Sequence, residues 1–256
     1  MVLIKLLTNI MKNINKLVVI TGSSKGIGKY FAGKLLENGH KVIGLSRSSP
    51  KIINKNYKHI FCDLSDLKDV KKKTNFLKKK KVFTLIHNAG IHGPINKFHS
   101  IEIDKWVSSF NVNLFSIAVI LKNIFGCFIK NKTSVIFLAG GGSTSGMKNF
   151  SCYSLAKTSL VRLCENLSIE YKNKFKFYCI SPGAIQTDLL KNAIKNGDKV
   201  PSKKIIDVDL PWQLCNFLIN NKKFNLSGRQ IHSKDNYQEW DIDLLNNDIY
   251  KLRRIV

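Results

Sequence analysis

Two side chains that can move a proton, Tyr153 and Lys157, stand four residues apart in the stretch NFSCYSLAK. On a helix this spacing places both on one face, one turn apart. An ammonium group beside a phenol favours the phenolate, so Lys157 is expected to lower the pKa of Tyr153 from about 10 toward neutrality. Such a tyrosine can exchange a proton with a hydroxyl or carbonyl oxygen, and the pair therefore predicts general acid–base chemistry.

A glycine-rich stretch, TGSSKGIG, covers Thr21 to Gly28 and follows the apolar run KLVVI. Glycines let the backbone turn sharply and approach a pyrophosphate, while the first turn of the next helix offers unpaired N–H groups. A strand, this loop and a helix, in that order, predict a dinucleotide site.

This TGxxxGxG pattern resembles the fingerprint of the short-chain dehydrogenase/reductase family, and further matches follow in the family's order. Asp63 in CDLSD is similar to the acidic residue near the adenine, and Asn113 in NVNLF is similar to the asparagine of the catalytic helix. The remaining matches are the NAG motif (Asn88, Ala89, Gly90), YxxxK (Tyr153, Lys157) and PGxxxT (Pro182, Gly183, Thr187). The resemblance implies an oxidoreductase that interconverts a carbonyl and a secondary alcohol by hydride transfer.

The same resemblance implies a role for each matched residue. Tyr153 is expected to be the general acid/base, Lys157 its electrostatic partner and a ligand of the nicotinamide ribose, and Asn113 the anchor of a proton relay. The residues expected to contact the dinucleotide are Gly22, Ser24, Lys25, Gly26, Ile27, Gly28, Arg47, Asp63, Leu64, Asn88, Ala89, Gly90, Tyr153, Lys157, Pro182, Gly183, Ile185 and Thr187.

The residues at the end of the second expected strand favour NADP(H) over NAD(H). An NAD site needs an acidic side chain there to accept from the ribose hydroxyls, whereas a 2′-phosphate needs cations. Ser46 stands about where the acid would be, and Arg47 follows it. Lys25 in the glycine loop is similar to the second basic residue of NADP-preferring members. NAD(H) stays an alternative, because Lys25 is one of many lysines.

The segment AGGGST departs from the family at the active site. The family usually has a serine thirteen residues before the tyrosine, where its hydroxyl binds the reacting oxygen; here that position is Gly140. Three explanations are open. Ser143, our first choice as a further catalytic residue, or its neighbours Thr144 and Ser145 supply the hydroxyl; a backbone N–H replaces it; or the site is impaired.

Short β-rich runs alternate with helical stretches along the whole chain, from KLVVITG to FKFYCISPG. Apolar strands separated by helices indicate a parallel sheet covered on both faces. The sequence therefore predicts an α/β, Rossmann-type doubly wound parallel sheet in a single domain at residues 16–256. Residues 1–15 are expected to be an N-terminal extension, and residues from about 188 to 210 are expected to form a substrate loop. Residues from about 232 to 256 are expected to form a C-terminal tail, to which the sequence assigns no function.

The composition narrows the function classes. Six cysteines without a CxxC pair indicate free thiols in the cytoplasm, with neither disulfides nor a metal site. No apolar run approaches the roughly 18 residues of a membrane span. The net charge of +25 is mostly lysine spread along the chain and accompanied by abundant Asn and Ile, so nucleic-acid binding is not expected.

The expected partners are a small carbonyl or alcohol substrate, with an anionic or sugar-like compound as a candidate, and further copies of the chain as a homodimer or homotetramer. Two other function classes stay open. A catalytically degraded dinucleotide-binding sensor or scaffold is favoured by Gly140 alone, and a nucleic-acid-binding protein by the charge alone.

Overall fold

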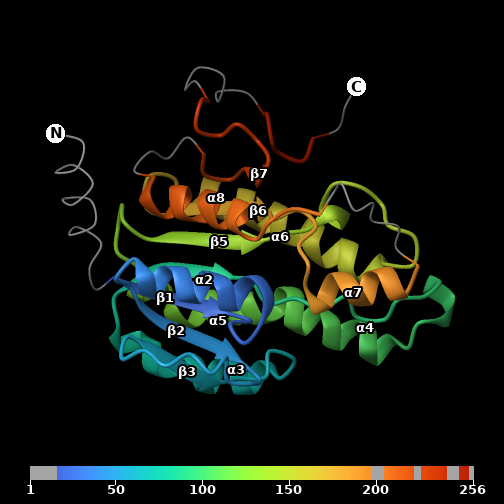
Figure 1. Ribbon diagram of the computed structural model, residues 1–256, viewed down its shortest axis with the longest axis horizontal. Helices are drawn as coiled ribbons and strands as arrows, with labels where there is room; N and C mark the ends of the chain where they lie inside the picture. The colour runs from blue at the N-terminus through green and yellow to red at the C-terminus, as the bar shows by residue number, and fades with distance from the viewer. Residues whose placement is uncertain (1–15, 198–204, 222–225, 241–247, 254–256) are drawn as a thin grey trace.

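The computed structural model describes residues 16–197, 205–221, 226–240 and 248–253. The expected extension at residues 1–15 lies outside them, as do parts of the expected substrate loop and tail. Within the described residues, seven parallel strands form one sheet in the order β3-β2-β1-β4-β5-β6-β7. This order, which reverses beside β1, confirms the predicted doubly wound fold (Figure 1).

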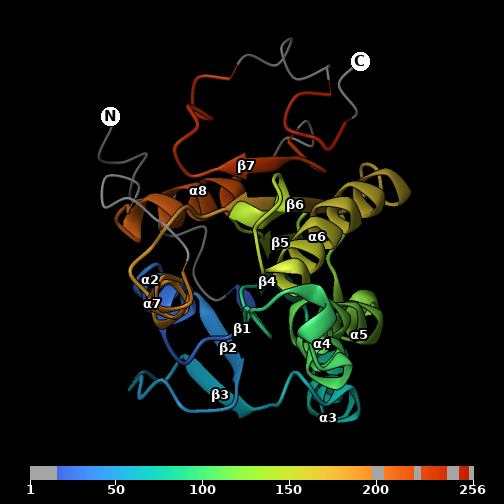
Figure 2. The same cartoon turned by 90° about the vertical axis from the view of Figure 1, so that its right-hand side faces the viewer.

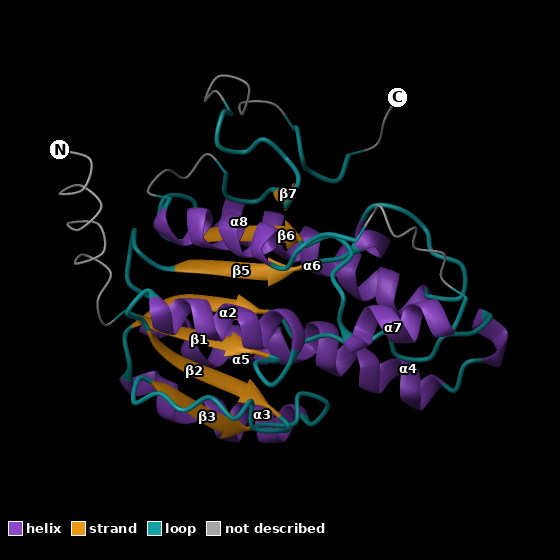
Figure 3. Ribbon diagram, in the orientation of Figure 1, coloured by secondary structure: helices purple, strands orange, loops and turns teal. Residues whose placement is uncertain are grey.

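The strands are short and mostly buried because helices cover both faces. They are β1 (Leu17–Thr21), β2 (Lys41–Ser46), β3 (Tyr57–Phe61), β4 (Val82–His87), β5 (Ser134–Leu138), β6 (Lys176–Ser181) and β7 (Gln230–His232). The helices are α2 (Gly26–Glu37), α3 (Leu67–Thr74), α4 (Ile103–Phe110), α5 (Ser116–Ile124), α6 (Ser151–Glu170), α7 (Asp188–Lys195) and α8 (Asp209–Asn220). Figure 3 shows the alternation of the two element types.

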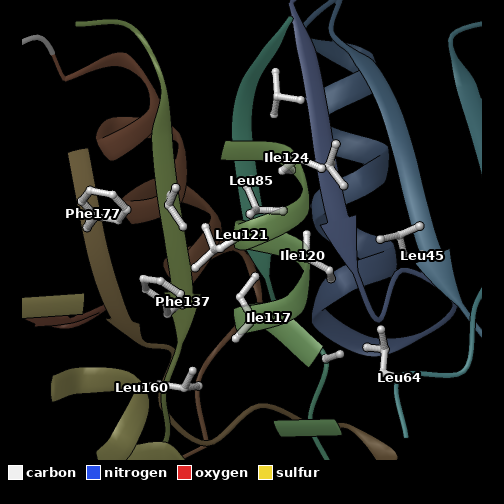
Figure 4. Packing of buried hydrophobic residues seen from close by; sticks show 14 of the residues in the cluster. Leu45, Leu64, Leu85, Ile117, Ile120, Leu121, Ile124, Phe137, Leu160 and Phe177 are labelled. Atoms are coloured by element: carbon white, nitrogen blue, oxygen red, sulfur yellow. The ribbon is translucent and has the colours of Figure 1, made fainter. Parts of the chain in front are cut away.

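Two hydrophobic cores hold the layers together. One packs α3, α5 and α6 on one face of the sheet, through residues such as Ile117 and Leu160, and Figure 4 shows part of it. The other packs α2 and α8 on the opposite face, through Phe31 and Leu218. The edge-on view in Figure 2 separates these two helical layers. All six cysteines are buried and unpaired, as predicted.

The helical segment Ile103–Cys127 is long and apolar enough to match a membrane span by composition, and 44% of its most apolar window is buried. It contains α4, α5 and a π-helical turn, Asn111–Phe115, between them. Helix α5 contributes Ile117 and Ile120 to the core, so burial accounts for the apolar side chains of α5, whereas Ile103 on α4 and Phe115 on the π-helical turn are exposed.

Candidate active site

The glycine loop and the NAG motif meet at the carboxyl ends of β1 and β4. Gly22 has φ +69°, and a Cβ there would lie 2.8 Å from the Ala89 Cα. The Asn88 Nδ2 donates to the carbonyl oxygens of Thr21 (3.1 Å) and Gly22 (3.0 Å). A Cβ at Gly28 would lie 2.2 Å from the Gly22 oxygen. Only glycine fits these positions without a shift of the neighbouring backbone.

This loop forms a cradle that suits the pyrophosphate of a dinucleotide. Helix α2 begins at Gly26, so the unpaired N–H groups of its first turn face the loop. A Cβ at Gly26 would lie 3.2 Å from the Thr187 Cγ2, which places the PGxxxT stretch across the cradle. Ser24 is half-buried here, and Ile27 packs against the core beneath.

The predicted adenosine contacts gather at the ends of β2 and β3. Arg47 is exposed and close enough to Asp63 to favour its carboxylate. Partial burial raises the pKa of Asp63, but hydrogen bonds from the Ser65 N–H (2.9 Å) and hydroxyl (2.8 Å), with Arg47, hold it below its ordinary value. Ser46 is buried and shares its hydroxyl with His59 Nε2 at 3.1 Å, and Leu64 is buried beside this site.

Lys25 has a different neighbour from the one expected. Its ammonium pairs with Asp188 at 2.7 Å, at the start of α7. Both side chains are largely exposed, so the ion pair is weak and a bound anion can compete with it. In this structure Lys25 therefore lies toward α7, while Arg47 lies at the expected adenosine end.

The PGxxxT stretch forms the wall opposite the glycine loop. Gly183 has φ +80°, and the Pro182 carbonyl accepts from the buried Ser233 hydroxyl at 2.9 Å. Ile185 is buried, and the Thr187 hydroxyl accepts from the Leu190 N–H at 3.3 Å as the N-cap of α7.

Asn113, Lys157 and Gly90 converge on one point. A Cβ at Gly90 would lie 3.0 Å from the Lys157 Nζ and 3.1 Å from the Asn113 Oδ1. The Lys157 Nζ donates to the Leu138 carbonyl at 2.8 Å, and Asn113 sits on the π-helical turn, fully buried. The structure thus brings together three of the residues that sequence reasoning assigned to catalysis or cofactor binding.

His87, which the sequence analysis did not single out, connects the backbone of Asn113 to Thr21 at the start of the glycine loop. Its Nδ1 lies 3.1 Å from the Thr21 hydroxyl and its Nε2 lies 3.0 Å from the Asn113 carbonyl oxygen. Burial lowers the pKa of His87 to about 3. A neutral imidazole with one N–H joins two polar groups without adding a charge. Its place directly before the NAG motif was the only sequence signal.

The electrostatics of Tyr153 correct one expectation. Burial raises the pKa of Tyr153 to about 12 and lowers that of Lys157 to about 8. The Lys157 Nζ lies 5.7 Å from the Tyr153 ring centroid. Desolvation of the phenol therefore outweighs the effect of the ammonium in this structure, contrary to the predicted shift toward neutrality.

The Gly140 region contains Ser143, the first choice for the missing hydroxyl, which already has two hydrogen-bond partners in this structure. The Ser143 hydroxyl donates to the Gly140 carbonyl at 2.6 Å and accepts from Gln230 Nε2 at 2.6 Å, and Ser143 is buried. The Ser143 hydroxyl is therefore already hydrogen-bonded to Gly140 and Gln230. Thr144 and Ser145 are exposed. A Cβ at Gly140 would lie 2.4 Å from the Tyr153 hydroxyl, so that hydroxyl fills the space of the missing side chain.

Two further residues lie here that the sequence analysis did not single out, His92 and Gln230. Neither belongs to a motif, and their neighbours come from distant parts of the chain. Among the described residues, no group of three or more His, Cys, Asp or Glu side chains is arranged to hold a metal ion.

Comparison with known proteins agrees with this geometry. The chain is 32% identical over 241 residues to the 3-oxoacyl-acyl-carrier-protein reductase FabG of Buchnera aphidicola subsp. Baizongia pistaciae, which covers 87% of this chain and 97% of the relative. It is 26% identical over 186 residues to the benzil reductase of Bacillus subtilis, covering 68% of this chain and 76% of the relative.

A solved structure shares the fold. The short chain dehydrogenase of Escherichia coli CFT073 in complex with NADPH superposes with a TM-score of 0.75 at 20% identity, covering 87% of this chain and 98% of the other. The family model for short chain dehydrogenases matches residues 16–198, from β1 through α7. With its glycine cradle, NAG motif and YxxxK helix in the family's order, the chain belongs to the short chain dehydrogenase family.

Proposed function

We propose that the protein is an NADP(H)-dependent carbonyl reductase that interconverts a small carbonyl compound and its secondary alcohol. One observation carries the proposal: Lys157 and Asn113 meet at Gly90, and Tyr153 lies one turn before Lys157 on α6, next to a glycine cradle shaped for a dinucleotide. When bound, the dinucleotide supplies or accepts the hydride.

The chain's own residues handle the proton and the position of the cofactor. Tyr153 donates its proton to the substrate oxygen in reduction and accepts it in oxidation. Lys157, with a pKa of about 8 set by burial, is charged at neutral pH and holds the ribose while it favours the phenolate. Gly22, Gly26 and Gly28 admit the pyrophosphate, and Asn113 fixes the backbone around the reacting atoms.

NADP(H) is proposed over NAD(H) because Arg47 lies exposed at the end of β2 and Ser46 replaces an acidic side chain. The NADPH complex of the E. coli structure supports this choice. The substrate class is proposed from the relatives: a diketone such as benzil, or a 3-oxoacyl thioester. We further propose a cytoplasmic location, which the six buried free thiols support.

A homo-oligomer is proposed from the surface of α4 and α6. Four large apolar side chains are exposed on α4, the π-helical turn and α6, three elements that contact one another. They are Ile103, Val107, Phe115 and Leu155. A second copy of the chain would bury them.

The test of the function is the substitution Tyr153→Phe, with benzil, acetoacetyl-coenzyme A and D-fructose as substrates and NADPH consumption as the readout. Loss of the general acid should lower kcat about 10²–10⁴-fold. Calorimetric titration should show unchanged NADPH affinity in the variant, and at least about tenfold weaker NADH binding, or about 1.4 kcal/mol, in both proteins. A wild-type protein that binds NADPH but reduces no member of a broad carbonyl panel would favour the sensor alternative.

A further inference from the structure

His92 lies directly against the general acid. Its ring centroid is 4.9 Å from that of Tyr153, at an interplanar angle of 81°, and 5.3 Å from that of Phe150, at 88°. Only 6% of His92 is exposed. The imidazole thus packs edge-to-face against Tyr153 on the loop that follows the NAG motif.

The backbone on both sides of His92 is held in place. Both side-chain polar atoms of Asn113 bind Ile91: its N–H donates to the Asn113 Oδ1 at 2.9 Å, and its carbonyl accepts from Nδ2 at 2.9 Å. Gly93 has φ +70°, and a Cβ there would lie 2.3 Å from the Ser109 hydroxyl. Asn113, a residue already placed in the site, therefore also positions the histidine.

The site requires a second hydrogen-bond donor to the substrate oxygen, and an imidazole N–H can supply it. As the carbonyl carbon accepts hydride, the carbonyl oxygen develops negative charge before it takes the Tyr153 proton, and a second hydrogen-bond donor stabilises that charge. Gly140 has no side chain, and the Ser143 hydroxyl is bound to the Gly140 carbonyl and Gln230. Neither of the two positions considered first from the sequence offers a free hydroxyl in this structure.

The side chains around Tyr153 are mostly apolar, so the polar imidazole of His92 is unusual among them. Tyr153 belongs to a hydrophobic cluster with Phe150 and Ala193, against which Ile95 and Met147 pack. In such surroundings a hydrogen bond to a developing oxyanion is worth more than in water, because no solvent competes for it. An imidazole among these side chains is in the right surroundings for that role.

We propose that His92 is a further catalytic residue, whose imidazole N–H donates a hydrogen bond to the substrate oxygen beside the Tyr153 hydroxyl, in place of the hydroxyl that Gly140 lacks. This inference rests on the proposed carbonyl reduction. It assigns to the loop after the NAG motif a task that the family's usual serine would perform from the end of β5.

The test separates hydrogen bonding from packing by two substitutions. His92→Phe keeps a ring against Tyr153 but removes the donor, whereas His92→Gln keeps an N–H donor but removes the ring. His92→Phe should lower kcat roughly 10²-fold with little change in KM, and His92→Gln should retain much more activity. His99→Phe, the same substitution at an exposed position, serves as the control. Thermal unfolding checks that each variant is folded.

A second measurement keeps the result independent of turnover. The ¹³C-labelled His92 ring signal, assigned by its loss in His92→Phe, is followed by NMR while benzil, acetoacetyl-coenzyme A or D-fructose is added to the NADP⁺ complex. A saturable shift with at least one probe is expected. If the enzyme turns over but His92→Phe is unimpaired, the His92 role is wrong and the reductase stands. If the wild type reduces nothing, the proposed function is wrong. If the signal does not move with any probe, the His92 role is wrong whether or not there is turnover.

Discussion

At the scale of single residues, close contacts around the tyrosine determine what the site tolerates. Gly140 is in an extended conformation that any residue can adopt, so sterics alone restrict the position. The 2.4 Å separation between its hypothetical Cβ and the Tyr153 hydroxyl leaves no room for a side chain. Restoring the family's serine would therefore displace Tyr153, the proposed general acid.

We expect Gly140→Ser to lower kcat roughly 10²-fold, since a displacement of a catalytic group by about 1 Å has an effect of that size. The matched control is Gly141→Ser, because a Cβ at Gly141 meets nothing within 4 Å. Steady-state kinetics on the best substrate compares the two. Higher activity of Gly140→Ser than of the wild type would contradict the prediction.

Lys157 should make dinucleotide binding depend on pH. Because burial lowers its pKa to about 8, the side chain is charged below that pH and neutral above it. If the charged form holds the cofactor, NADPH affinity should be constant below about pH 7 and fall, by up to about tenfold per pH unit, above pH 8. Calorimetry from pH 6.5 to 9.5 measures this, and Lys157→Met should bind more weakly without the pH dependence.

The control for Lys157→Met is Lys172→Met, which removes the same charge from an exposed position. Its binding curve should match that of the wild type. An affinity that does not change across the whole pH range in the wild type would show that the Lys157 ammonium does not contribute to cofactor binding.

At the scale of elements, α6 both carries the proposed catalytic pair and forms part of the hydrophobic core. Its first turns carry Tyr153 and Lys157, and its middle turns pack Leu160, Val161 and Cys164 into the core beneath β5 and β6. The proposed catalytic pair is therefore positioned by the packing of the core behind it. Near the end of the helix, the buried Glu165 pairs with Arg253 at 2.6 Å and thereby holds the described C-terminal segment.

Packing of α6 should dominate its contribution to stability. Leu160→Ala removes a fully buried side chain and should lower the free energy of unfolding by about 2–5 kcal/mol. Ile169→Ala removes an isomeric side chain that is 67% exposed on the same helix and should change it by less than about 0.5 kcal/mol. Urea unfolding measures both, and equal losses would contradict the assignment of the buried face.

At the scale of the whole molecule, a net charge of +25 coexists with an apolar face on α4 and α6. Like charge on two copies opposes association, so burial of apolar surface must outweigh it and high salt should strengthen the oligomer. The proposed dimer or tetramer is therefore governed by two opposing terms that can be tested separately.

We expect the wild type to be a dimer or tetramer by sedimentation velocity at micromolar concentration, and Ile103→Glu to shift it toward monomer. Burying an unpaired carboxylate in an apolar contact is strongly unfavourable. Ile53→Glu is the control, since Ile53 is fully exposed in the β2–β3 connection. A monomeric wild type would contradict the proposal.

The sequence by itself determined the fold class and most of the cofactor cradle. The glycine loop, the NAG motif and the YxxxK spacing are local features, because a positive φ or a one-turn repeat depends on nearby residues and can be recognised along the chain. Alternating apolar strands and helices similarly imply a sheet with two covered faces.

Only the tertiary structure decided which side chains meet inside that frame. The Lys25–Asp188 ion pair, the hydrogen bond between Gln230 and the Ser143 hydroxyl, and the ring of His92 against Tyr153 each join segments that are distant in sequence. The direction of the Tyr153 pKa shift was also predicted wrongly, because the spacing to Lys157 is visible in the sequence but the degree of burial is not. Desolvation and contact depend on the packing of all neighbouring elements at once, and no local pattern contains that information.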